Sequence, residues 1–445
     1  MPAVLFQEPE ETKLEAAQRK VAELEAELGP EHSDLIEPIR AVMLIHFKSA
    51  QYVKAEDSYR QILSIKEKNL GAEHPEVAQS LNFLASLAGK QGSYAKARPL
   101  LERVLEIYEK SYGPEHPKVA ESLNSLAILL KSQGSFVEAR FFFERALRIN
   151  EKSLGREHPK VAQSLMSIAF LLELQESHAE ARPLLERALT IRVKQFGPEH
   201  PNIGIFLGHL ANNFRFQGAY LEAQAMAERV LEIYEKAYGP EHLFVAGWLN
   251  TLGEIFQAQG FHGKSKPLHE RALAIQEKSL GLDHIETAKS LSNLATLFKL
   301  QGSYAEAQLL YERALANQES FLGSRHLFVA ATLNDLGALF QAQGLYGRAR
   351  LFYERVRSIQ EYLGPEHPST AIHFNNLAGL FQVQGAYAEA RPLYKQALGI
   401  TLGNLSKNMG LMTEMGRFQY IATKVGPEPL LLNLAAMRGK GPDKD

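Results

Sequence analysis

The sequence predicts an all-α fold of about nine stacked helical hairpins, with capping helices at the ends. The first observation is a loop motif, Gly-x-Glu/Asp-His-Pro or a near variant, that recurs along the 445 residues. Its first seven intervals are 42 residues each and its last is 41. The glycines of the motif are Gly29, Gly71, Gly113, Gly155, Gly197, Gly239, Gly281, Gly323 and Gly364. A fixed period of this length indicates a repeat architecture.

The second observation is a turn marker halfway along each unit. Gln91-Gly92 lies 21 residues after the loop glycine Gly71. The marker recurs at Gln133-Gly134, Gln217-Gly218, Gln259-Gly260, Gln301-Gly302, Gln343-Gly344 and Gln384-Gly385. One unit breaks it, with Gln175-Glu176. Each unit therefore divides into two halves.

The third observation is that both halves carry apolar stripes at helical spacing. In the unit that begins at Gly71, the stripes are Val77, Leu81, Leu84, Ala85 and Ala88, then Ala97, Leu101, Val104, Leu105 and Tyr108. Pro75 suits a first helical turn, and Gly113 suits a left-handed cap at a helix C-terminus. Two such helices cannot bury their stripes alone, whereas stacked hairpins can.

These residues lead to a family resemblance. Leu81-x2-Leu84-Ala85-x2-Ala88, followed by Gly92-x-Tyr94-x2-Ala97, resembles the tetratricopeptide repeat signature. The 42-residue length and the loop Gly-Pro-Glu-His-Pro-x-Val-Ala are similar to the kinesin light chain type of this repeat. The resemblance covers about residues 29–400 and implies a right-handed α-α superhelix.

The repeats suggest a domain plan for the whole chain. We expect the array over 29–400, with units starting near residues 29, 71, 113, 155, 197, 239, 281, 323 and 364. Residues 12–28 are expected to form an N-terminal capping helix, or alternatively a short coiled-coil arm. Residues 401–437 are expected to form a degenerate C-terminal repeat and cap, and residues 1–11 and 438–445 to be disordered.

Composition excludes several classes of function. A net charge of −2 gives no reason to expect a nucleic-acid partner. The absence of cysteine excludes disulfides, thiolate zinc sites and cysteine nucleophiles. The N-terminus lacks the pattern of a signal peptide, and no apolar run approaches the ~20 residues of a membrane span. We therefore expect a soluble cytoplasmic protein without membrane contact, with a monomer favoured.

The histidines of the loops raise a metal hypothesis. They are His32, His74, His116, His158, His200, His242, His284, His326 and His367. Because they occur once per unit, neighbouring copies should lie too far apart to share an ion, and a repeated helix-capping contact is the favoured interpretation. No catalytic constellation is present. The sequence thus predicts no metal, no cofactor and no enzyme.

The resemblance implies a binding groove lined by the first helix of each unit. One inward position holds asparagine in five units: Asn82, Asn124, Asn250, Asn334 and Asn375. Arg40, Met166, Gly208 and Ser292 hold it in the others. An amide offers both a donor and an acceptor, so a row of them can clasp an extended peptide whatever its sequence. The alternative is that each asparagine bonds to a neighbouring helix.

Other inward positions would supply specificity. Met166, Phe170, Leu174, Ile205 and Phe216 make an apolar break that is either a binding pocket or tighter packing between degenerate units. The inward basic residues are Arg40, Lys48, Lys90, Lys131, Arg215, Lys289 and Lys299, against the acidic Glu37, Glu121, Glu173 and Glu254. This balance leans towards a peptide with acidic flanks.

The sequence as a whole predicts a non-catalytic scaffold or adaptor. Its ligand would be an extended peptide or helix of a partner protein, bound in the concave groove. The alternative is a regulatory sensor arm that acts on a separate effector protein through flexing of the superhelix.

Overall fold

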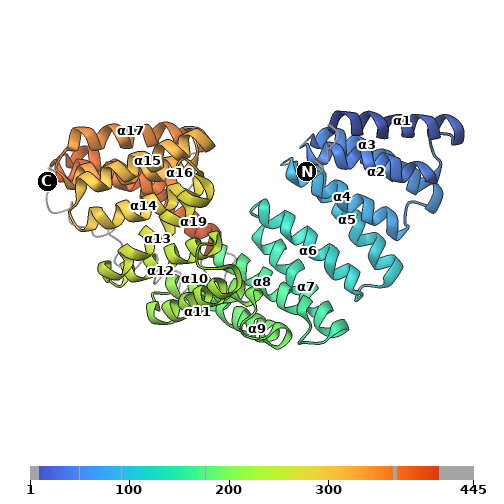
Figure 1. The fold of residues 1–445 in the computed structure, drawn as a ribbon, viewed down its shortest axis with the longest axis horizontal. Helices are drawn as coiled ribbons and strands as arrows, with labels where there is room; N and C mark the ends of the chain where they lie inside the picture. Colours follow the sequence, from blue (N-terminus) through green and yellow to red (C-terminus); the bar gives the residue numbers. More distant parts are fainter. Residues whose placement is uncertain (1–9, 50, 92, 176, 364–367, 410–445) are drawn as a thin grey trace, which may run out of the picture. The chain divides into compact units, whose positions relative to one another are not determined.

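The computed structural model describes residues 10–49, 51–91, 93–175, 177–363 and 368–409. Within them all regular structure is helical, with one short 3₁₀ turn at Ser33–Leu35 (Figure 1). Helix α1 spans Glu10–Leu28, and nine helical hairpins follow. The prediction of an all-α fold of about nine hairpins is confirmed.

The first helices of the hairpins are α2 (Ile36–Lys48), α4 (Pro75–Lys90), α6 (Pro117–Ser132), α8 (Pro159–Leu174), α10 (Pro201–Phe216), α12 (Leu243–Ala258), α14 (Ile285–Leu300), α16 (Leu327–Ala342) and α18 (Pro368–Val383). The second helices are α3 (Tyr52–Leu70), α5 (Tyr94–Tyr112), α7 (Phe136–Leu154), α9 (His178–Phe196), α11 (Tyr220–Tyr238), α13 (His262–Leu280), α15 (Tyr304–Leu322), α17 (Tyr346–Leu363) and α19 (Tyr387–Met409).

The chain divides into two compact units between Leu171 and Leu172, within α8. In the first unit, Val21 and Leu24 of α1 pack against the buried Leu35 and Ile62. A further core joins α4 to α7 and includes the fully buried residues Val77, Val104, Val119, Leu123 and Ala146. The apolar stripes predicted for this unit thus meet as each hairpin stacks on the next.

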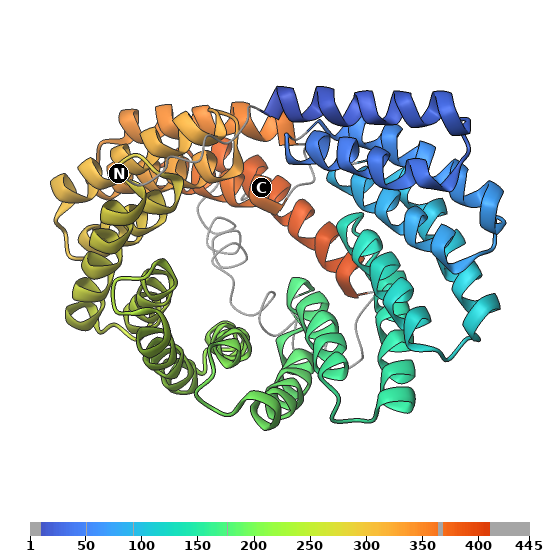
Figure 2. The same ribbon diagram turned by 45° about the vertical axis from the view of Figure 1, so that its right-hand side comes forward.

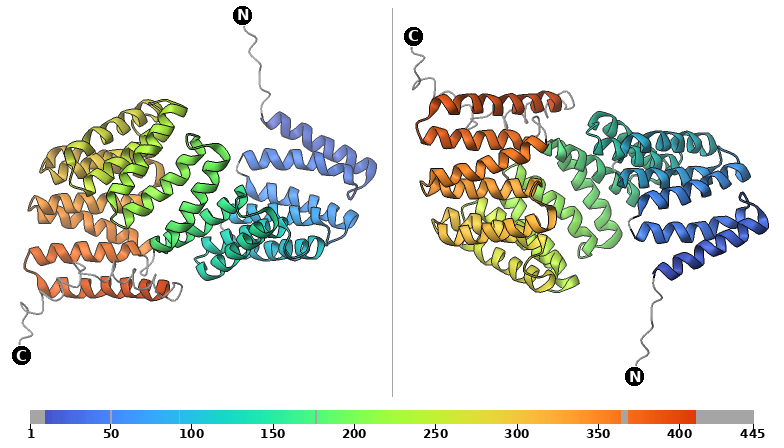
Figure 3. Two further views of the ribbon diagram at one scale, coloured as in Figure 1. Left: turned by 90° about the horizontal axis from the view of Figure 1, so that it is seen from below. Right: turned by 90° about the horizontal axis from the view of Figure 1, so that it is seen from above.

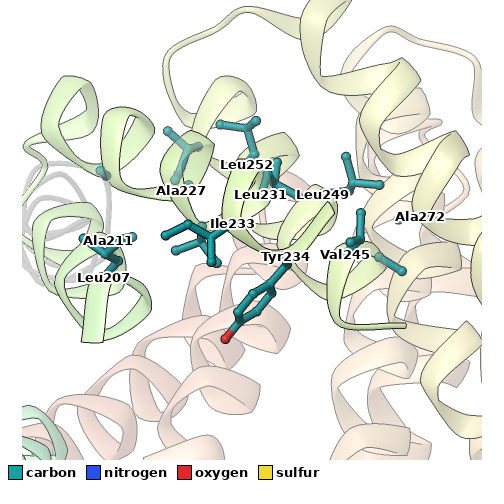
Figure 4. Packing of buried hydrophobic residues seen from close by; sticks show 14 of the residues in the cluster. Leu207, Ala211, Ala227, Leu231, Ile233, Tyr234, Val245, Leu249, Leu252 and Ala272 are labelled. Carbon is teal, nitrogen blue, oxygen red and sulfur yellow. The ribbon is translucent and has the colours of Figure 1, made fainter. Parts of the chain in front are cut away.

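The second unit stacks its hairpins in the same way. Neighbouring helices lie side by side along the unit (Figures 2 and 3). Side chains from α10, α11, α12 and α13 share one core (Figure 4). A second core joins α14 to α18 around Tyr311, Leu333 and Tyr353. Every hairpin therefore buries apolar surface against its neighbours, as a repeat array requires.

The loop that precedes each first helix is held by its histidine. The Nδ1 atom of the histidine accepts a hydrogen bond from the backbone N–H two residues later, at 3.1 to 3.3 Å. The residues are His32, His74, His116, His158, His200, His242, His284 and His326. The capping interpretation is confirmed for these eight, and His367 lies outside the described residues.

The loop glycines end the second helices in an extended conformation. Gly113 has φ 85° and ψ 157°, and its N–H donates to the Glu109 carbonyl at 3.0 Å. The predicted left-handed helical cap is therefore wrong in ψ, although φ is positive as expected. Side chains essentially never adopt this combination, so glycine is required at this position.

Neighbouring first helices contact one another in the second unit. Helix α12 contacts α14, α14 contacts α16, and α16 contacts α18. No comparable contact joins two second helices within the described part of this unit. The first helices thus lie closer together, as on the concave side of a curved stack. We call the surface of α12, α14, α16 and α18 on this side the inner face.

The C-terminal hairpin differs from the predicted boundary. Helix α19 continues without interruption to Met409, although a new unit was expected from residue 401. Residues 410–445, which hold most of the expected degenerate repeat and the tail, lie outside the described residues.

Candidate functional site

Three of the predicted asparagines have an amide oxygen that is buried without a partner in the described structure. Asn124, Asn334 and Asn375 are half-buried, and the Oδ1 atom of each is buried without a hydrogen-bond partner among the described residues. An unpartnered buried polar atom costs about 1–3 kcal/mol, so such atoms are rare and call for an explanation. The Nδ2 atom of each amide makes no hydrogen bond within the described structure and is not completely buried.

Asn250 is different from the other members of the row. It is 1% exposed, and its Nδ2 donates to Ser290 Oγ at 2.5 Å. Its Oδ1 lies 2.9 Å from Nδ1 of the buried His269. The amide is therefore fully engaged between helices and is not open to a ligand. At this residue the alternative interpretation is correct: the asparagine bonds to neighbouring helices and not to a ligand.

The N-terminal members of the predicted site are exposed or paired. Asn82 is exposed on α4. Arg40 is half-buried, and its guanidinium donates to Glu37 at 2.6 Å. The side chain of Lys90 lies outside the described part of the chain.

The asparagine row is interrupted where the repeats degenerate. Gly208 occupies the row position on α10, and the Trp248 ring from α12 covers it so closely that a Cβ atom would collide with the ring. Trp248 thus packs against the core of the second unit. The row cannot continue here, because an indole fills the place of an amide.

A small apolar and basic surface lies in the first unit. The Lys131 ammonium lies 4.5 Å from the ring centroid of Phe170, and Met166 is half-buried on the same helix as Phe170. Burial lowers the pKa of Lys131. Ile128 is 51% exposed one turn before Lys131. Leu174, Ile205 and Phe216, the other predicted apolar residues, belong to the second unit and are 48% to 59% exposed there.

Two predicted basic residues meet at one carboxylate in the second unit. Glu254 of α12 lies 3.5 Å from Nη1 of Arg215 and 3.5 Å from Nζ of Lys289. Asn293 also donates to Glu254, at 3.0 Å. The guanidinium lies 4.6 Å from the centroid of the exposed Phe216 ring. Three first helices are thus linked by one acidic side chain with two long ion pairs.

The remaining predicted lysine lies near a second acidic group. Lys299 Nζ lies 5.9 Å from the ring centroid of Tyr311, and its charge acts on Asp335 of α16. No ion pair within 4.0 Å joins Lys299 and Asp335 in the described structure. Burial raises the pKa of Asp335, and the charge of Lys299 only partly opposes that effect.

Sequence comparison identifies the repeat. A family model described as "Tetratricopeptide repeat" matches residues 41–110, 76–152, 160–236, 205–260, 244–320, 310–361 and 328–402. These stretches cover most of the chain. The chain belongs to the tetratricopeptide repeat family. The predicted identity, including the kinesin light chain-like type of unit, is confirmed.

Solved structures resemble this tetratricopeptide repeat protein to different extents. A Podosopora anserina putative kinesin light chain with nearly identical TPR-like repeats is 30% identical over 46% of this chain and 97% of that one, with a TM-score of 0.43. The apo form of the quorum sensor NprR from B. thuringiensis is 14% identical over 85% and 99%, with a TM-score of 0.57. A Rap protein complexed with competence and sporulation factor is 13% identical over 90% and 100%, with a TM-score of 0.50. No curated protein sequence matches the chain.

Membership of the family gives the broad function. Tetratricopeptide repeat proteins are in general non-catalytic scaffolds or sensors that take part in protein interactions. Within the described ranges no three His, Asp or Glu side chains are grouped so that they could hold a metal ion. No described helix combines the length and the apolar character needed to cross a membrane.

Two polar residues of the inner face were not predicted. Each lies one residue after a member of the asparagine row: Asn293 follows Ser292, and Asp335 follows Asn334. This position, one residue after the asparagine row, holds Phe83, Ser125 and Ser167 in the first unit. In the second unit it holds His209, Thr251, Asn293, Asp335 and Asn376. A comparison of this row between units would have singled out Asp335 as its acidic member.

Proposed function

We propose that this tetratricopeptide repeat protein is an interaction scaffold that binds an extended segment of a partner protein on its inner face. The observation that carries the proposal is the pair Asn334 and Asn375. They lie on the neighbouring first helices α16 and α18, and each has one amide atom that is buried without a partner. Their Nδ2 groups are available to donate to the C=O groups of a peptide main chain.

Main-chain recognition would give affinity without strict sequence preference, because every residue of an extended peptide offers the same groups. The side chains beside the amides would then set the preference. In the second unit these are Arg215, Lys289 and Lys299. The first two form ion pairs with Glu254. In the first unit, Asn82, Asn124 and the Lys131–Phe170 surface would offer a separate stretch of contacts.

The test is the binding of displayed peptides to the double variant Asn334→Ala/Asn375→Ala. A random library of peptides about 12 residues long is selected on the full chain, and dissociation constants are measured for the enriched peptides. Loss of two hydrogen bonds, each contributing about 1 kcal/mol, should weaken binding about tenfold or more. The same loss is expected for peptides of unrelated sequence.

The matched control is Gln224→Ala/Gln308→Ala. Both glutamines lie on second helices, are half-buried, and donate to a glutamate one turn later at 2.8 Å. This variant should bind as the wild type does. Equal affinities for the asparagine variant and the wild type would contradict the proposal, as would an equal loss in both variants.

A further inference from the structure

Asp335 lies on the inner face without a bonding partner. It is half-buried on α16, directly after Asn334. Within the described structure it makes no hydrogen bond and no ion pair within 4.0 Å. A carboxylate that is partly removed from water and left without donors is unfavourable unless something else supplies them.

The hydroxyl groups around Asp335 are engaged elsewhere. The Tyr311 hydroxyl lies 2.7 Å from Thr296 Oγ1, and that threonine hydroxyl also donates to the Ser292 carbonyl at 2.9 Å. The Tyr353 hydroxyl donates to Gln341 at 3.3 Å. Both tyrosines are close enough for the carboxylate to raise their pKa, together with the larger effect of their burial. The tyrosine and threonine hydroxyls near Asp335 are thus already bonded and do not donate to it.

Equivalent positions in other hairpins show what is missing at Asp335. Asn293, one unit earlier, donates to Glu254 of the preceding hairpin at 3.0 Å. His209, three units earlier, lies 3.4 Å from Glu173. Each bonds across to the hairpin before it. In the hairpin before Asp335, the residue that corresponds to Glu254 is Thr296, whose hydroxyl is already bonded. The residue that corresponds to Glu173 is Lys299, which makes no ion pair with Asp335 within 4.0 Å in the described structure.

We propose that Asp335 anchors a cationic group of the bound segment, a guanidinium or an ammonium. The inference rests on the proposed function, because Asn334 would hold the peptide main chain at the adjacent residue. A cation of the peptide would supply the donors that the carboxylate lacks and offset the cost of its burial. Asp335 is thus a specificity-determining residue, and Lys299 is its competitor within the protein.

The chemistry allows two sources for the cation. One is an internal Arg or Lys side chain, and the other is the N-terminal ammonium of a peptide. Two display libraries, one with free and one with acetylated N-termini, distinguish them. A side-chain cation is enriched at one position in both libraries, whereas a terminal ammonium gives enrichment only in the free library.

The test repeats both selections on wild type, Asp335→Asn and Asp335→Glu. The wild type should enrich the cation at one position, Asp335→Asn should lose that preference about tenfold while still enriching peptides, and Asp335→Glu should keep it. Asp283→Asn, which removes one negative charge from an exposed loop, should behave as the wild type. Lys299→Gln should strengthen the preference, since the competing ammonium is gone.

The outcomes separate this inference from the proposed function. If the wild type enriches peptides without a cationic preference, or if Asp335→Asn keeps that preference, the inference is overturned and the scaffold remains. If the wild type enriches no peptide, both are overturned. As a second measurement, citrulline replaces the selected arginine in a synthetic peptide. The affinity loss with wild type should be about tenfold, and with Asp335→Asn the same replacement should have no further effect.

Discussion

Individual glycines on the first helices make room for large side chains of the next element. Gly208 lies under Trp248, Gly204 under Tyr234, and Gly337 under Tyr353. In each pair the glycine has no side chain, and a ring from another helix occupies the space beside it. At these three positions the ring fills the space that a side chain on the first helix would otherwise take, as close packing of a protein interior requires.

The Gly208 pair gives a prediction with an internal control. A methyl group at Gly208 would collide with the Trp248 ring, so Gly208→Ala should lower the free energy of unfolding by about 1–3 kcal/mol. Gly247 lies in α12 with no atom within 4 Å of the place a Cβ would take. Gly247→Ala should instead stabilise by roughly 0.5–1 kcal/mol, because alanine favours helices. Urea unfolding measures both, and a similar effect of the two changes would contradict this packing.

Two buried histidines predict a pH dependence of stability. Burial lowers the pKa of His269 and of His373 from 6.5 to about 4. The unfolded chain binds a proton at each histidine below pH 6.5, but the folded chain does not do so until about pH 4. Stability is therefore complete above pH 6.5 and falls as the pH drops towards 4, by about 2 kcal/mol per histidine at pH 5.

The variant His269→Tyr isolates one of these contributions. Tyrosine should fit, because His269 packs over Gly253 as Tyr353 packs over Gly337. The loss of unfolding free energy between pH 7.5 and pH 5 should be smaller in the variant than in the wild type by about 2 kcal/mol. The measured quantity is the difference between the two pH values, so an overall change in stability does not affect it. Identical pH dependences would refute the assignment to His269.

At the scale of elements, each first helix depends on its histidine cap. His74 accepts from the Glu76 N–H at 3.2 Å and has no aromatic contact among the described rings. His74→Ala should lower the stability of the first unit by about 1 kcal/mol, whereas His74→Asn keeps a capping acceptor and should lose much less. Thermal unfolding of both variants checks this. Equal losses would mean that the ring acts by packing and not as a cap.

The sequence predicted the elements well and the site only in part. Helices, hairpins and the histidine caps depend on local sequence and recur from unit to unit. The positions of α4 to α17 could therefore be predicted from the sequence. The state of an asparagine is not local. Asn250 is buried because His269 and Ser290, which lie 19 and 40 residues away, happen to bond to it. Asn334 and Asn375 have no such partners, and periodicity alone cannot distinguish the two cases.

For the whole molecule, the division into two compact units coincides with an irregularity in sequence. The division of the chain lies between Leu171 and Leu172. A few residues later the turn marker is broken at Gln175-Glu176, and Gly208 replaces the asparagine of the row in the next hairpin. The sequence indicated degenerate repeats here but not that the chain divides, because division depends on contacts summed over whole hairpins. The inner face of the second unit is continuous from α12 to α18, since each of these first helices contacts the next.

The central claim is that the amides of this inner face hold the main chain of an extended partner segment. A crystal structure of the full chain with a peptide enriched in the selection tests it most directly. The account predicts peptide main-chain atoms within about 3 Å of the Asn334 and Asn375 amides. A peptide bound on the second helices, or one that reaches the inner face through side chains alone while both amides stay unbonded, would contradict it.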